Sequence, residues 1–71
     1  MQQLEFQLRG EFVELCNLLK LSGVCDSGGA GKTLVAEGVV YVDGQVELRK
    51  TAKIRVGQVV SLGDVQIRVM V

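Results

Sequence analysis

The chain has 71 residues, of which 48% are hydrophobic and 23% charged, and it contains no histidine and no proline. This length and composition predict one small domain over residues 1–71, with a modest core, and exclude a disordered linker. The lack of histidine removes the usual proton shuttle and the commonest metal ligand. No apolar run approaches the roughly 18 residues of a membrane span, and no basic region followed by an apolar stretch opens the chain. We therefore expect a cytoplasmic protein without membrane contact.

The net charge is zero, with eight Lys and Arg against eight Asp and Glu, but the charges are unevenly distributed. Residues 1–26 carry two basic and four acidic side chains, whereas residues 27–55 carry five basic and three acidic ones. A neutral chain is not typical of a strong nucleic-acid binder. The uneven distribution nevertheless predicts a basic patch within residues 27–55.

The first elements are a strand and a helix. Apolar residues alternate with polar ones from Leu4 to Leu8, which predicts a half-buried strand. From Glu11 the apolar spacing changes to three and four residues, which predicts an amphipathic helix with Glu11 in its first turn and Lys20 in its last. Ser22-Gly23 indicates the end of this helix. Its apolar face comprises Phe12, Leu15, Cys16 and Leu19.

A second helix is predicted from about Gly28 to Glu37, with Asp26 or Ser27 as its cap and Gly38 after its end. One side of this helix is mostly apolar. On the other side, Gly29 and Lys32 are surface neighbours because they are three residues apart. The apolar side comprises Ala30, Gly31, Leu34 and Val35.

The rest of the chain is predicted to be β. Asp43-Gly44 indicates a tight hairpin turn, with a return strand that continues through Val46 and Leu48. The basic segment Arg49–Lys53 is expected to be irregular, and Gly63-Asp64 indicates a second hairpin. Helices that precede a run of strands predict an α+β fold. In that fold, two helices pack on one side of a small, mainly antiparallel sheet with an extra N-terminal strand.

The segment Gly28–Thr33 ends in Gly-Lys-Thr, as does the nucleotide-binding P-loop. That motif requires a glycine where this chain has Asp26, and a strand before it where this chain has a helix and a loop. We therefore expect no nucleotide cofactor. The scattered carboxylates form no pair spaced for acid–base catalysis, and no histidine is present to activate Cys25. From the sequence we therefore expect a protein that is not an enzyme and that has neither catalytic residues nor a metal site.

Two segments are candidates for anion binding. The glycines at the start of the second helix are either a flexible lead-in or a bare surface that a phosphate backbone can approach. The segment Arg49–Arg55 carries four cations in seven residues, and it is either a solvated connector or a phosphate-binding patch together with Lys32. Tyr41 either covers the sheet surface or stacks on a base.

A series of short motifs between residues 11 and 62 belongs to a known pattern. Its most specific part is a helix that ends in glycine, followed by x-Val-x-Val-Asp-Gly and a basic segment before Gly57. This series resembles the RNA-binding domain named after ribosomal small-subunit protein S-four, also called the αL RNA-binding motif. It is most similar to the small stand-alone YbcJ-like bacterial proteins, which share the Ser-Gly-Gly-Ala start of the second helix and Asp-Gly-x-Val-Glu-x-Arg-Lys. The other matching residues are Leu15, Leu18, Leu19, Lys20, Lys32, Glu37, Gly38, Lys53, Ile54 and Gln58.

This resemblance implies a non-catalytic module, without cofactor, that binds structured RNA such as ribosomal or transfer RNA. Many members have basic residues where this chain has Gly28 and Gly29, which implies a lower affinity and a weaker salt dependence here. The alternative is an adaptor that binds ribosome-associated or assembly proteins. The excess of acidic over basic side chains in residues 1–26 favours this alternative. The RNA-binding residues implied by the resemblance are Lys20, Ser27, Gly28, Gly29, Lys32, Arg49, Lys50 and Lys53.

Overall fold

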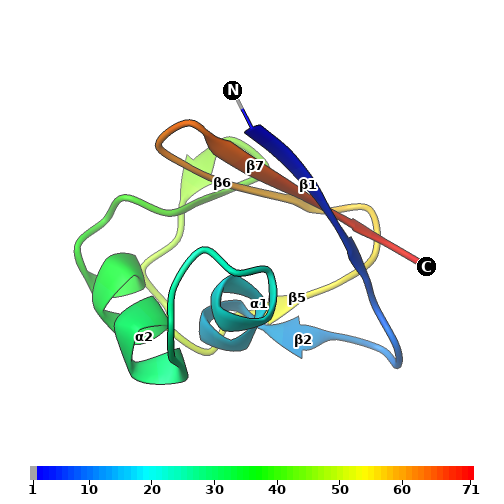
Figure 1. Ribbon diagram of the computed structural model, residues 1–71, viewed down its shortest axis with the longest axis horizontal. Helices are drawn as coiled ribbons and strands as arrows, with labels where there is room; N and C mark the ends of the chain where they lie inside the picture. Colours follow the sequence, from blue (N-terminus) through cyan, green and yellow to red (C-terminus); the bar gives the residue numbers. More distant parts are fainter. Residues whose placement is uncertain (1) are drawn as a thin grey trace.

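The computed structural model describes residues 2–71, which form a sheet with two helices on one of its faces (Figure 1). Within this range, no helix has the length and apolar character needed to cross a membrane. The elements are β1 (Gln2–Gln7), β2 (Val13–Glu14), α1 (Leu15–Leu21), α2 (Gly28–Ala36), β3 (Tyr41–Val42), β4 (Gln45–Val46), β5 (Lys53–Ile54), β6 (Val59–Leu62) and β7 (Val65–Met70).

The main sheet has five strands in the order β1-β7-β6-β3-β4, and β2 and β5 form a separate two-stranded sheet. β3 pairs in antiparallel fashion with β4 and with β6, and β6 pairs in the same way with β7. β1, by contrast, pairs with β7 in parallel. The predicted fold class is confirmed, including the N-terminal strand. The alternation in β1 is also confirmed, because Leu4 and Phe6 are partly buried while the residues beside them are exposed.

The predicted start of the first helix is wrong. α1 begins at Leu15 and not at Glu11, because Val13 and Glu14 pair in antiparallel fashion with Ile54 and Lys53. Phe12 therefore precedes the helix and is 38% exposed. The prediction failed because the apolar spacing of residues 12–19 resembles that of a helix, whereas the strand partners of Val13 and Glu14 lie 41 and 39 positions further along the chain.

α2 begins and ends almost as predicted. The Ser27 hydroxyl accepts a hydrogen bond from the backbone N–H of Ala30 at 3.1 Å, which caps the first turn. Gly38 follows the helix with a φ of +76°, a backbone conformation that favours glycine. Gly31 and Val35 are buried against the rest of the molecule, as the apolar side of the predicted helix required.

The first hairpin turns at Asp43-Gly44, as predicted, with positive φ at both residues. Its return strand is shorter than predicted, because β4 ends at Val46 and Leu48 is 60% exposed. The predicted irregular segment also ends one residue early, since Lys53 pairs with Glu14 in the two-stranded sheet.

The core lies between the helices and the main sheet. Its centre is made of aliphatic side chains from both layers, and Cys16 is buried beside them, as predicted. The fully buried side chains are Leu15, Leu18, Leu19, Val35, Val40, Ile54, Val60, Ile67 and Val69.

Candidate nucleic-acid interface

The basic segment Arg49–Lys53 is attached to the start of α1 by its backbone. The N–H of Leu15 donates to the carbonyl of Ala52 at 2.9 Å, and the N–H of Cys16 donates to the carbonyl of Lys50 at 3.1 Å. These bonds satisfy two of the N–H groups that a helix leaves unpaired at its start, where Glu14 supplies no side-chain cap. The segment is therefore fixed by α1 through its backbone, which leaves its charged side chains at the surface.

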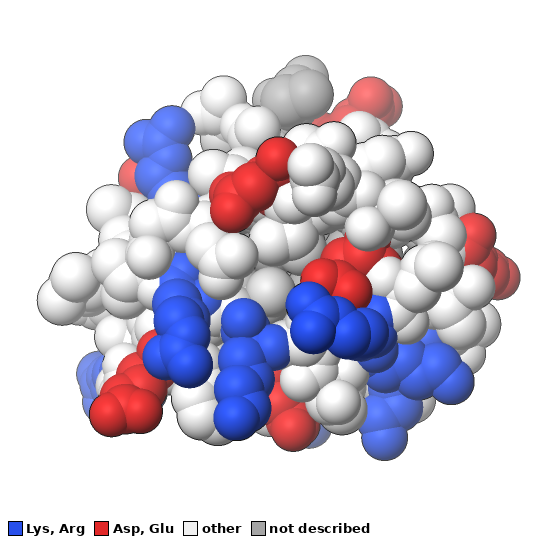
Figure 2. Space-filling model, turned by 180° about the vertical axis from the view of Figure 1, so that it is seen from behind, with Lys and Arg blue, Asp and Glu red and all other residues white. Residues whose placement is uncertain are grey.

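Figure 2 shows one face of the molecule on which Lys and Arg side chains gather in a row across the lower half, with a few acidic groups among them. The net charge of the whole chain is zero. Positive side chains thus gather on a face of a chain without net charge, and a phosphate backbone can be attracted to that face.

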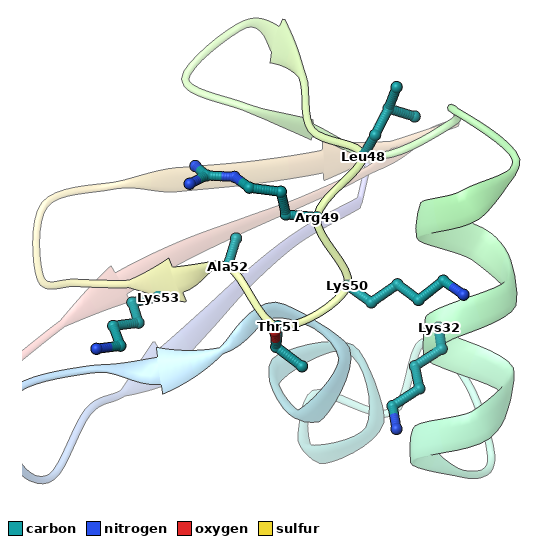
Figure 3. Close-up of a pocket in the computed structure, with 7 residues that line it drawn as sticks. All are labelled: Lys32, Leu48, Arg49, Lys50, Thr51, Ala52 and Lys53. Atoms are coloured by element: carbon teal, nitrogen blue, oxygen red, sulfur yellow. The ribbon is translucent and has the colours of Figure 1, made fainter.

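A hollow opens in this face between the basic segment and α2 (Figure 3). We call it the basic hollow. Lys50 extends toward α2, from which Lys32 projects, whereas Arg49 and Lys53 extend the other way along the segment. The structure therefore brings four of the residues expected to bind RNA around one hollow, although they come from two distant parts of the chain. The residues that line it are Lys32, Leu48, Arg49, Lys50, Thr51, Ala52 and Lys53.

The four cations of the basic hollow differ in their partners. Within residues 2–71, no hydrogen bond or ion pair engages the ammonium group of Lys32 or of Lys50. Arg49, by contrast, donates from Nε to Glu47 Oε2 and from Nη2 to Glu47 Oε1, both at 3.0 Å. These hydrogen bonds from the Arg49 side chain, and a further one from its backbone N–H, hold the pKa of Glu47 below its ordinary value.

Phe12 is an aromatic residue that contacts two cations of this basic surface, Lys53 and Arg55. Lys53 Nζ lies 4.9 Å from the centroid of the Phe12 ring, and Arg55 Cζ lies 5.9 Å from it. Both distances are within the range of a cation–π interaction. This contact was not predicted, because the apolar spacing of the sequence places Phe12 on the apolar face of a helix.

The other residues expected to bind RNA lie outside the lining of the basic hollow. Ser27, Gly28 and Gly29 form the start of α2, one turn before Lys32. In the described part of the chain, Gly28 faces open space, and a side chain at Gly29 would have the Ser27 hydroxyl as its only close neighbour. Lys20 is in the last turn of α1, at the end opposite to the one that the basic segment contacts.

Tyr41 is 42% exposed on β3, on the side away from the buried Val40, as its position in the alternation predicted. It lies opposite Val46 on one neighbouring strand and Ser61 on the other. Cys25 is partly buried, and its thiol donates to the carbonyl of Ser27 at 3.3 Å. It therefore supports the turn before α2.

Comparisons with known proteins agree with this architecture. The chain is 52% identical over 58 residues to YbcJ of Escherichia coli (strain K12) and to YbcJ of Shigella flexneri, which covers 82% of this chain and 83% of each relative. The solution structure of YbcJ from E. coli, described as revealing an αL motif involved in RNA binding, matches with a TM-score of 0.71 and 44% identity. That match covers 100% of this chain and 89% of the other. The family model of the S4 domain matches residues 6–70, and the chain therefore belongs to the S4 domain family.

Proposed function

We propose that this protein is a non-catalytic, cytoplasmic RNA-binding protein of one domain that contacts the phosphate backbone of structured RNA, such as ribosomal or transfer RNA. The observation that carries this proposal is the basic hollow, which Lys32 of α2 and Lys50 of the basic segment both line, with Lys50 extending toward α2. The similarity to YbcJ, whose structure is described as containing a motif involved in RNA binding, supports the same class of ligand.

The chemistry of the basic hollow suits a phosphate backbone. Lys32 and Lys50 present ammonium groups as point charges, while Arg49 presents a planar group that matches two phosphate oxygens at once. Contacts of this kind position a protein on a nucleic acid without reading its bases. The binding is thus expected to depend on the shape of the RNA and on salt.

The main experiment compares wild-type protein with Lys32→Glu/Lys50→Glu in binding to a fluorescein-labelled RNA stem-loop, followed by fluorescence anisotropy. Reversal of both charges is expected to abolish binding, because two of the three lysine ammonium groups that line the hollow become carboxylates. Circular dichroism checks that the variant is folded, which we expect because both side chains are at the surface.

The matched control is Arg9→Glu/Arg68→Glu, which changes the net charge by the same amount. Both arginines are exposed and lie outside the lining of the basic hollow. This control is expected to weaken binding only slightly, through long-range electrostatics. Equal losses in the two double variants would reject the hollow as the site, and an unchanged affinity of Lys32→Glu/Lys50→Glu would reject the proposal.

A second hollow favours the alternative of an adaptor for ribosome-associated or assembly proteins. It lies on α2 and the turn before it, and its lining combines apolar side chains with two acids, a combination that suits a basic peptide. Crosslinking in cells followed by nuclease treatment distinguishes the two functions, since only a protein partner remains associated after nuclease and high salt. The residues of this hollow are Val24, Cys25, Asp26, Ala30, Thr33, Leu34 and Glu37.

A further inference from the structure

Glu47 is the acidic residue most closely associated with the basic hollow, and its position needs an explanation. It carries a negative charge beside a surface that we propose to bind phosphate, and the side chain of Glu47 is only 18% exposed while that of Arg49 is 80% exposed. Simple electrostatics predicts that such a carboxylate weakens RNA binding. The hydrogen bonds between the two side chains indicate a different role.

The contacts of Glu47 fix both ends of Arg49. One carboxylate oxygen, Oε2, accepts from the backbone N–H of Arg49 at 3.1 Å and from its Nε at 3.0 Å, while Oε1 accepts from Nη2 at 3.0 Å. A free arginine side chain at the surface has many rotamers, which cost entropy to restrict on binding. The two hydrogen bonds that the Glu47 carboxylate accepts from the Arg49 side chain select one of these rotamers before any ligand arrives, and the third, from the backbone N–H, holds the carboxylate in place.

The donors that Arg49 retains have the geometry that a phosphate requires. Of the five N–H groups of a guanidinium, two donate to Glu47, and these are on the edge formed by Nε and Nη2. The edge formed by Nη1 and Nη2 keeps two parallel N–H groups. Such an edge binds two oxygens of one phosphate in a bidentate manner.

We propose that Glu47 is a positioning residue that orients Arg49 so that its Nη1–Nη2 edge receives one phosphate of the bound RNA. This inference rests on the proposed function. It assigns Arg49 a task different from that of Lys32 and Lys50, which attract the backbone by charge alone. The pair of Glu47 and Arg49 has little net charge and contributes direction rather than attraction.

The experiment is a double-mutant cycle of Glu47→Ala and Arg49→Ala, with affinity for the labelled RNA stem-loop as the readout. If Glu47 positions Arg49, Glu47→Ala weakens binding by about 3- to 10-fold although it removes a negative charge, because Arg49 must then be ordered at a cost in entropy. In the Arg49→Ala background, the same change is expected to strengthen binding slightly. Tighter binding of Glu47→Ala in the presence of Arg49 would overturn the proposal.

Conservative variants test the geometry separately. Arg49→Lys keeps the charge but loses the bidentate edge, so it is expected to weaken binding by about 3-fold or more. Lys50→Arg is the matched control and is expected to stay within about 2-fold of the wild type. Equal affinities of Arg49→Lys and the wild type would also overturn the proposal.

The failure of this inference differs from that of the proposed function. If wild-type protein and Lys32→Glu/Lys50→Glu bind the stem-loop equally, the proposed function fails. If the wild type binds, the lysine variant does not and Glu47→Ala binds more tightly, only the role of Glu47 is rejected. Glu5→Gln removes a negative charge outside the basic hollow and controls for the change in net charge.

Discussion

Gly31 of α2 lies so close to Cys16 of α1 that a Cβ atom on Gly31 would stand 2.7 Å from the Cys16 carbonyl oxygen and 3.2 Å from its Cα. Both neighbouring atoms belong to backbone, so neither can move as a flexible side chain would. The lack of a side chain at Gly31 thus sets the separation of the two helices. The next residue, Lys32, lines the basic hollow, so this contact also sets the position of one of its cations.

The first prediction concerns the stability of Gly31→Ala. Alanine favours a helix over glycine by up to about 1 kcal/mol, but overpacking against the α1 backbone costs about 1–3 kcal/mol. We expect a net loss of about 1–2 kcal/mol in the free energy of unfolding, measured by urea denaturation. Gly28→Ala is the control, since its side chain would face open space. A Gly31→Ala variant as stable as Gly28→Ala would show that α1 and α2 can separate without cost.

A second prediction distinguishes the two interpretations of the glycines at the start of α2. Among residues 2–71, a side chain at Gly28 meets nothing within 4 Å, and one at Gly29 meets only the Ser27 hydroxyl at 3.8 Å. Gly28→Ala/Gly29→Ala should therefore keep or raise the stability. If a phosphate backbone approaches this turn, the same variant should bind the RNA stem-loop several-fold more weakly. Unchanged affinity would favour the flexible lead-in and exclude Gly28 and Gly29 from the site.

The elements that the sequence predicts well are those with local causes. α2 has its cap at Ser27 and a glycine with positive φ after its end, and all of these positions lie within 12 residues. The hairpin at Asp43-Gly44 likewise depends on the conformation of two adjacent residues. Such features follow from neighbouring residues alone, so they can be predicted without knowledge of the fold.

The features that the sequence analysis missed have distant causes. Val13 and Glu14 form a strand because Lys53 and Ile54 lie beside them, and the parallel partner of β1 is β7, at the other end of the chain. The grouping of Lys32 with the basic segment was expected, but the contact of Phe12 with Lys53 was not, because it depends on the pairing of β2 with β5. Alternation predicts which side of a strand is buried but does not identify its partner.

The third prediction concerns the salt dependence of RNA binding. If about three to five phosphates are neutralised, the slope of log K against log salt is roughly −2 to −4. Lys50→Ala should reduce the magnitude of this slope by about 0.7–0.9, the contribution of one phosphate. The double variant Glu47→Ala/Arg49→Ala should change the slope less, because the charges of the two side chains compensate each other and their joint removal leaves the net charge unchanged. Anisotropy titrations at several salt concentrations measure both slopes, and equal changes would contradict the distinction between Lys50 and the pair of Glu47 and Arg49.

The fourth prediction concerns Phe12, whose ring lies within cation–π distance of Lys53 and Arg55. Phe12→Leu keeps an apolar side chain but removes the ring, so it should lower the free energy of unfolding by about 0.5–1 kcal/mol through this interaction. In a Lys53→Met/Arg55→Met background the same change should cost less. Urea denaturation of the four proteins measures the difference, and equal costs in both backgrounds would show that Phe12 acts through apolar contact alone.

The last prediction concerns pH. The side-chain hydrogen bonds of Arg49 lower the pKa of Glu47, whereas the pKa of glutamate in an unfolded chain is about 4.3. A carboxyl group with a lowered pKa in the folded state contributes stability that is fully present above the unfolded value and is lost as the pH falls through the folded value.

The wild type should therefore lose this contribution below about pH 4.3, while at neutral pH the pair of Glu47 and Arg49 stays intact. Glu47→Gln has no such titration, so the difference in urea midpoint between it and the wild type should shrink as the pH falls from about 6 to 3. A difference that stays constant over this range would show that the ion pair does not contribute to folding. Carbon NMR of the Glu47 carboxyl group measures its pKa directly, and a value at or above that of the unfolded chain would contradict the geometry.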